Sequence, residues 1–101
     1  MDLALNGKTA LVTGGSRGLG RQSALSLAAE GVNVAICGRT RQTLDIAVSE
    51  IEKNGVNALG IEADVSDVKS MHYLHSEVES QLGPIDILVN NAGGSRARTN
   101  I

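Results

Sequence analysis

A short apolar segment that runs directly into a glycine-rich turn constrains the fold of this chain more than any other feature. The segment Thr9–Val12 has the composition of a buried strand, and it is followed by Thr13-Gly14-Gly15-Ser16-Arg17-Gly18-Leu19-Gly20. Glycine permits a tight turn and lets bare backbone N–H groups approach an anion. The helix expected to begin near Leu19 directs the positive end of its dipole at the same place. The segment therefore predicts a strand–turn–helix unit that holds the pyrophosphate of a nucleotide.

The spacing of the glycines sharpens this prediction. Gly14, Gly18 and Gly20 form a G-x-x-x-G-x-G pattern. Gly14 is expected to make the turn, Gly18 to let a phosphate approach closely, and Gly20 to let the helix pack against the sheet. No Gly-Lys-Ser or Gly-Lys-Thr follows, which excludes a P-loop. A glycine turn can also be purely structural, but three glycines between a strand and a helix favour nucleotide binding.

Strand-like and helix-like segments alternate along the chain. Four strands are predicted, at Thr9–Thr13, Val32–Cys37, Asn57–Ala63 and Ile85–Val89. Three helices are predicted between them: Leu19–Glu30, a helix from an N-cap at Thr40 to Asn54-Gly55, and a helix from an N-cap at Ser66 to Gly83-Pro84. The expected apolar faces are Leu44, Ala47, Val48 and Ile51 on the second helix, and Val68, Met71, His75, Val78 and Leu82 on the third.

Short connections between such segments produce right-handed crossovers and a parallel sheet. The predicted fold class is therefore α/β, a doubly wound parallel sheet with strand order 3-2-1-4, and its ligand is expected between strands 1 and 4. Residues 1–93 are predicted to form the nucleotide-binding unit. The polar, basic segment 94–101 is predicted to be a flexible tail.

The end of the second strand bears on which nucleotide is bound. An NAD site expects an acidic residue there, which bonds to the ribose 2′-hydroxyl group. This chain has Cys37-Gly38-Arg39-Thr40-Arg41 instead. An arginine can clamp a 2′-phosphate with several charged donors, so Arg39, with Arg17 of the glycine turn, favours NADP(H) over NAD(H). The alternative, that Arg39 and Arg41 are solvated residues at the start of a helix, runs against the helix dipole. The missing acid also argues against a methyltransferase that uses S-adenosylmethionine.

Composition and charge exclude several other classes of protein. A net charge of −2 gives no reason to expect nucleic acid or an anionic membrane as a partner. A single cysteine, Cys37, cannot form an internal disulfide, and neither a signal-like start nor a membrane-length apolar run is present. These features predict a cytoplasmic protein. His72 and His75 lie three residues apart without a third ligand in view, so no metal site is predicted.

Three motifs together resemble those of the classical short-chain dehydrogenase/reductases, especially the 3-oxoacyl-acyl-carrier-protein reductases. They are Thr13-Gly14-x-x-x-Gly18-x-Gly20, Asp64-Val65 and Asn90-Asn91-Ala92-Gly93, and the resemblance covers nearly the whole chain. It implies a Rossmann fold and NADP(H)-dependent reduction of a carbonyl or oxidation of an alcohol. It also implies a homo-oligomer for the full-length enzyme.

The resemblance assigns roles to particular residues. The pyrophosphate and the adenosine ribose would be lined by Gly14, Ser16, Arg17, Gly18 and Leu19, and Gly20 belongs to the same motif. Arg39 would meet the 2′-phosphate, and Asp64 and Val65 the adenine. Asn91, Ala92 and Gly93 would border the ribose and approach the nicotinamide, while Asn90 would brace the sheet with backbone hydrogen bonds.

The sequence departs from the family in its catalytic residues. The family uses a serine, a tyrosine with a lysine four residues later, and an asparagine on a later helix. The only tyrosine here is Tyr73, and Glu77 follows it four residues later. The chain is therefore expected to carry the cofactor-binding part alone, with the catalytic residues beyond Ile101, and to be inactive by itself. A non-catalytic nucleotide-binding module, or an inactive truncated fragment, is the alternative interpretation.

Overall fold

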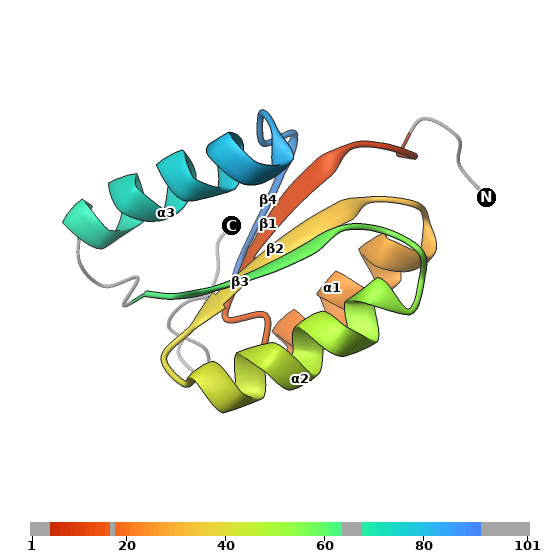
Figure 1. Cartoon of the computed structure of the whole chain (residues 1–101), viewed down its shortest axis with the longest axis horizontal. Helices are drawn as coiled ribbons and strands as arrows, with labels where there is room; N and C mark the ends of the chain where they lie inside the picture. Colours follow the sequence, from red (N-terminus) through yellow and green to blue (C-terminus); the bar gives the residue numbers. More distant parts are fainter. Residues whose placement is uncertain (1–4, 17, 64–67, 92–101) are drawn as a thin grey trace.

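Four parallel strands form a single sheet between two layers of helices (Figure 1). The computed structural model describes residues 5–16, 18–63 and 68–91. The elements are, in chain order, β1 (Thr9–Thr13), α1 (Gly18–Ala29), β2 (Asn33–Gly38), α2 (Arg41–Glu52), β3 (Ala58–Glu62), α3 (Val68–Leu82) and β4 (Ile87–Asn90). The strand order is β3-β2-β1-β4, which confirms the predicted order 3-2-1-4.

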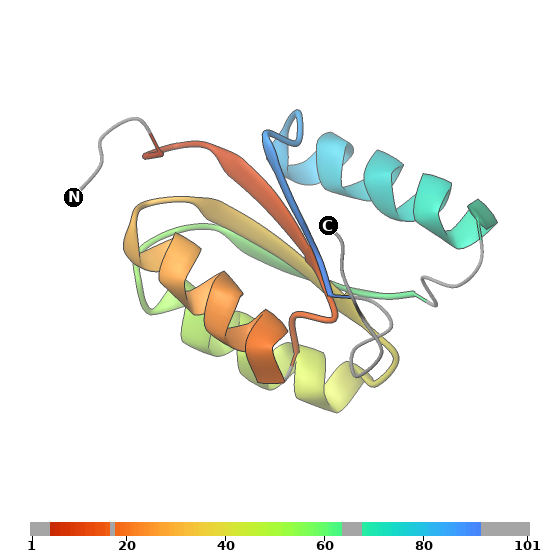
Figure 2. The same ribbon diagram turned by 180° about the vertical axis from the view of Figure 1, so that it is seen from behind.

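The two faces of the sheet are covered by different helices. Figures 1 and 2 show α1 and α2 together on one face and α3 alone on the other. On the first face the buried core includes Ala10 and Val12 of β1, and on the second it includes Leu11. Because β1 and β2 are covered on both sides, their sequences are almost continuously apolar, as expected for central parallel strands.

The strand β4 begins two residues later than predicted, because Asp86 is used to secure the edge of the sheet. The Thr9 backbone N–H donates to Asp86 Oδ2 at 2.9 Å, and the Asp86 N–H donates to the Thr9 carbonyl oxygen at 2.8 Å. Ile85 packs into the core on the α3 side instead of extending the strand. The apolar character of Ile85 was therefore correctly recognised, but its place in the strand was wrong.

The predicted apolar face of α3 is also corrected. Leu74 and Val78 are the buried residues of this helix, and Leu74 was not predicted. Val68 is 71% exposed and His75 only half-buried. Leu74 lies three residues after Met71 and four before Val78, so it completes the stripe that meets the sheet. Val68 lies in the first turn, which extends past the end of β3 in Figure 1.

The start of α2 is confirmed in position but not in mechanism. Thr40 occupies the N-cap position with extended backbone angles, yet its side chain makes no capping hydrogen bond. Its carbonyl oxygen accepts from the Leu44 N–H at 3.1 Å and from Thr43 Oγ1 at 3.1 Å. The predicted cap at Ser66 and the segment 94–101 lie outside the described residues.

Candidate nucleotide-binding site

The glycine-rich turn leaves β1 through backbone conformations that favour glycine. Gly14 has a φ of +68° and Gly18 a φ of +62°, both in the left-handed region. The Gly14 N–H donates to the Cys37 carbonyl oxygen at 3.1 Å, which ties the turn to the end of β2. Apart from its chain neighbours and the backbone of its own helix, no described atom lies within 4 Å of the position that a Gly18 side chain would occupy. The turn therefore leaves open space at the N-terminus of α1, as an approaching phosphate requires.

Gly20 has a different structural role from the one predicted. A Cβ atom at this position would overlap the Gly14 carbonyl oxygen and lie 2.8 Å from the Gly14 carbonyl carbon. Gly20 therefore lets α1 pack against the preceding turn, and the prediction that it packs against the sheet is corrected. The turn is held closely against the helix because no side chain separates the two backbones.

Gly15 is a structural requirement that sequence reasoning missed. Its Cβ atom would overlap the Ile36 side chain and lie 3.1 Å from the Val12 carbonyl oxygen. The turn therefore passes directly over β2, with no room for a side chain. The only sign of this requirement in the sequence is the pair Gly14-Gly15, of which the G-x-x-x-G-x-G pattern includes only Gly14.

Thr13 fastens the ends of β1 and β4 to each other. Its buried hydroxyl donates to Asn90 Oδ1 at 3.0 Å and accepts from the Asn91 N–H at 2.8 Å. Asn90 was expected to brace the sheet through its backbone, and here its side chain contributes as well. Thr13 belongs to the glycine-turn motif but was not predicted as a site residue. The sequence does not reveal its partners, which lie 77 and 78 residues away.

Asn91 presents a buried amide donor beside the glycine turn. A Cβ atom on Gly14 would lie 3.5 Å from the Asn91 carbonyl oxygen, so the two backbones are adjacent. The Asn91 Nδ2 atom is buried and has no hydrogen-bond partner among the described residues. A buried donor that makes no hydrogen bond destabilises the folded state by about 1–3 kcal/mol, and such donors are rare in folded proteins. An oxygen-rich ligand between β1 and β4, such as a dinucleotide, fits this donor.

The end of β2 approaches the same turn. A Cβ atom on Gly38 would lie 3.0 Å from Ser16 Oγ and 3.5 Å from the Leu44 side chain. Ser16 is buried at 7% exposure, and the next residue after Gly38, Arg39, is exposed. The backbone of Arg39 is thereby held near the predicted phosphate-binding turn.

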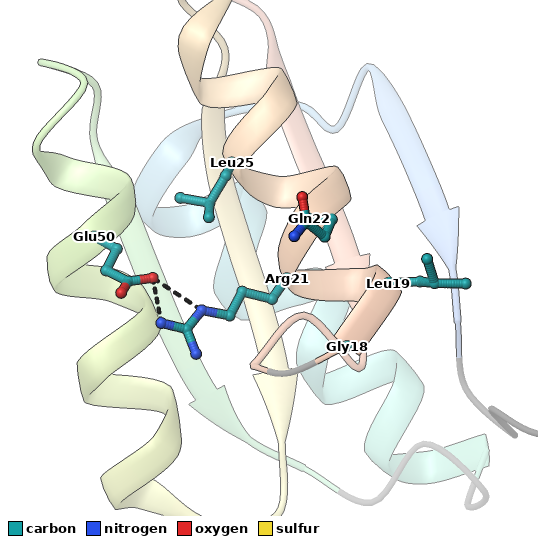
Figure 3. A pocket seen from close by; sticks show the side chains of 6 residues that line it. All are labelled: Gly18, Leu19, Arg21, Gln22, Leu25 and Glu50. Carbon is teal, nitrogen blue, oxygen red and sulfur yellow. Dashed lines mark hydrogen bonds and ion pairs between the residues drawn. The ribbon is translucent and has the colours of Figure 1, made fainter.

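Seven predicted site residues lie in the described part of the chain, at or just beyond the carboxyl ends of β1, β2 and β4. They are Gly14, Ser16, Gly18, Leu19, Gly20, Arg39 and Asn91. Leu19 is 80% exposed and points away from α2, towards β4 (Figure 3). The predicted residues Arg17, Asp64, Val65, Ala92 and Gly93 lie outside the described residues.

A cavity of about 650 Å³ lies beside this site, between α1 and α2 (Figure 3). Its lining residues are Gly18, Leu19, Arg21, Gln22, Leu25 and Glu50. Arg21 Nε donates to Glu50 Oε1 at 2.8 Å, and Arg21 Nη2 also pairs with this oxygen. The ion pair joins the first turn of α1 to α2, and so fixes the two helices that flank the cavity.

The Arg21–Glu50 pair is expected to make the free energy of unfolding depend on pH. The hydrogen bond from Arg21 lowers the pKa of Glu50 below its ordinary value of 4.5. The stabilisation is therefore present above pH 4.5 and is lost as the pH falls through the lower pKa of the folded state. Urea unfolding should show Glu50→Gln less stable than the parent at pH 7, with the difference vanishing in strong acid. Glu52→Gln, on the exposed side of α2, is the control. An equal loss for the two variants at pH 7 would contradict the role of the pair.

The other reactive side chains have ordinary structural positions. Cys37 is buried, and burial raises the pKa of its thiol, which agrees with an apolar packing role. His72 is exposed, and no cluster of three metal-ligating side chains occurs within the described ranges. In the same part of the chain, no helix is long and apolar enough to span a bilayer.

The sequence is similar to those of dehydrogenases and reductases. The family profile described as short chain dehydrogenase matches residues 8–100. The 3-oxoacyl-[acyl-carrier-protein] reductase FabG of Staphylococcus aureus is 47% identical over 90 residues, which are 88% of this chain and 37% of that protein. The 2-dehydro-3-deoxy-D-gluconate 5-dehydrogenase of Formosa agariphila is 40% identical over 90 residues, 88% of this chain and 34% of that protein. The chain thus spans about a third of the length of these relatives.

Solved structures show the same likeness. A putative short-chain alcohol dehydrogenase from Sinorhizobium meliloti 1021 superposes with a TM-score of 0.79 at 40% identity, covering 82% of this chain and 33% of its own. An NAD⁺-bound xylitol dehydrogenase superposes with a TM-score of 0.80 at 33% identity, covering 83% and 32%. These agreements place the sheet and its glycine turn in the architecture of this group.

Proposed function

The chain belongs to the short chain dehydrogenase family, and on this premise we propose that it is the cofactor-binding part of an NADP(H)-dependent oxidoreductase. The whole enzyme would reduce a carbonyl group or oxidise an alcohol. The bound nicotinamide would supply or accept the hydride. The observation that carries the proposal is the buried Asn91 amide, which has no hydrogen-bond partner among the described residues and lies beside Gly14 where β1 and β4 end together.

The residues of this chain would bind and orient the cofactor. The turn at Gly14 and Gly18 and the N-terminus of α1 would hold the pyrophosphate through backbone N–H groups. The Asn91 amide would donate to an oxygen of the nucleotide, and Thr13 would keep Asn91 in place. We retain Asp64 and Val65 for the adenine, and Ala92 and Gly93 for the nicotinamide side, as proposals from the sequence.

The end of β2 supports NADP(H) over NAD(H). An acidic side chain there would repel a 2′-phosphate, and this chain has Gly38 instead, beside the hydroxyl of Ser16. The exposed Arg39 follows directly and would supply charged donors, together with Arg17. The NAD⁺-bound xylitol dehydrogenase shows that this architecture also accepts NAD⁺, so the preference depends on these residues and not on the fold.

Direct binding tests the proposal. Binding can be followed by the fluorescence of the reduced nicotinamide. Titration should show that the chain binds NADPH more tightly than NADH, and that an excess of NADP⁺ displaces the NADPH. No binding of either cofactor to the folded chain would contradict the proposed function.

Turnover is expected to be absent from the chain alone. Protonation of the developing alkoxide by a positioned acid contributes typically about 10²–10⁴-fold to the rate. The sequence places Glu77, and not lysine, four residues after its single tyrosine, Tyr73, which is 54% exposed on α3. Incubation with NADPH and 3-oxoacyl thioesters, the substrate class that the reductase relative suggests, should leave the absorbance of NADPH unchanged.

A non-catalytic nucleotide-binding module is the second candidate, because the residues that meet at the ends of β1 and β4 are suited to holding a nucleotide. A Tyr-x-x-x-Lys motif would distinguish the two candidates. A longer form of the protein that contains the motif would decide for the enzyme. We further propose that the protein acts in the cytoplasm as a homo-oligomer. The single, buried thiol of Cys37 supports a reducing compartment.

A further inference from the structure

Two hydrogen bonds, to β3 and to the residue after it, flank the turn between β2 and α2, and Arg39 lies between them. On one side, the Ala63 N–H donates to the Gly38 carbonyl oxygen at 3.0 Å. On the other side, Arg41 Nη2 donates to the Gly60 carbonyl oxygen at 3.0 Å. The two hydrogen bonds join residues that are 25 and 19 positions apart in the sequence, so they restrain the turn from outside α2 itself.

The guanidinium group of Arg41 contacts residues of both α2 and β3. Arg41 Nη1 lies 3.1 Å from Asp45 Oδ1, and Arg41 Nε lies 3.6 Å from Glu62 Oε1. A Cβ atom on Gly60 would lie 3.5 Å from Arg41 Nη1 and 3.0 Å from the Val48 side chain. The glycine in β3, which weakens the strand pattern in the sequence, therefore makes room for α2 and for Arg41. The partners of the Arg41 guanidinium are therefore two carboxylates and a backbone carbonyl of the chain itself.

We infer that Arg41 is a positioning residue for the proposed 2′-phosphate site, where it holds the β2–α2 turn against β3 so that Arg39, the residue after Gly38, stays near the glycine-rich turn. This inference rests on the proposed preference for NADP(H). An arginine on a surface turn binds a phosphate more tightly when the backbone of the turn is already ordered, because less conformational entropy is then lost on binding. Arg41 would thus act through Arg39 without touching the phosphate.

A double-mutant cycle on the whole chain separates this role from direct binding. Arg41→Ala should raise the Kd for NADPH about three- to tenfold, the effect of a lost hydrogen bond, and leave the Kd for NADH unchanged. In an Arg39→Ala background, Arg41→Ala should have no further effect on the ratio of the two constants. Lys53→Ala, which removes an exposed cation at the other end of α2, should leave the ratio as in the parent.

Several results would overturn the inference. Effects of Arg39→Ala and Arg41→Ala that add in the double variant would make Arg41 a direct ligand of the phosphate. A parent preference for NADPH that Arg39→Ala removes, but Arg41→Ala preserves, would remove the positioning role and leave the proposed cofactor intact. A parent without any preference would overturn the proposed cofactor and this role together.

Hydrogen exchange measures the anchoring without any cofactor. The Ala63 amide, which donates to Gly38, should exchange faster in Arg41→Ala than in the parent or in Lys53→Ala. Arg41→Lys keeps the charge but not the fork of donors, so it should resemble Arg41→Ala. Unchanged exchange in Arg41→Ala would show that Arg41 does not hold the turn.

Discussion

Replacing Gly20 with alanine is expected to weaken NADPH binding at least about a hundredfold. The added methyl group would overlap the Gly14 carbonyl oxygen, and its nearest neighbours are all backbone atoms of Gly14 and Gly15. Backbone cannot move aside as a flexible side chain can, so α1 and the turn must separate. The separation would displace the N–H groups proposed to hold the pyrophosphate. Titration followed by nicotinamide fluorescence, with circular dichroism to confirm folding, measures the effect.

Gly55→Ala is the matched control for this prediction. Unlike Gly20, Gly55 has a positive φ, +83°, and apart from its chain neighbours no described atom lies within 4 Å of its added Cβ atom. The variant should lose only the stability that backbone strain removes, of the order of 1 kcal/mol, and should bind NADPH like the parent. A folded Gly20→Ala chain with the affinity of the parent would show that close contact between α1 and the turn is not needed for binding.

Arg39→Asp is expected to reverse the preference between the two cofactors. A charge-assisted contact to the 2′-phosphate is worth about 1.5–3 kcal/mol, so its loss should raise the Kd for NADPH about ten- to a hundredfold. The Kd for NADH should be unchanged or lower, because a carboxylate in this region can accept a bond from the 2′-hydroxyl group. Calorimetric titration with both cofactors gives the two constants.

Lys53→Asp makes the same change of charge at an exposed position at the far end of α2. It should shift the affinity for NADPH only slightly, and the shift should disappear as salt is added. If the two variants weaken NADPH binding equally, net charge and not a specific contact explains the effect. Equal affinity of the parent for both cofactors would contradict the assignment of Arg39.

Sequence patterns were sufficient for the order of the elements and for bringing together the strand ends at which the site is proposed. The apolar segments at β1 and β2 and the glycine turn between β1 and α1 lie where the sequence indicated, within one residue. The order 3-2-1-4 follows because short crossovers between parallel strands have one hand. The same rule brings the ends of β1 and β4 together, and with them Gly14 and Asn91.

Only the tertiary structure decided which side chains act on one another. The sequence does not indicate that Arg41 is engaged by Gly60 and Glu62 of β3, about 20 residues later. The need for glycine at position 15 comes from Ile36 on the next strand, and the role of Thr13 comes from Asn91, 78 residues later. Local sequence patterns reflect the backbone conformation of a segment and which of its faces is exposed to solvent. They do not record how close a distant segment will come, because that distance is set by how the helices and strands pack.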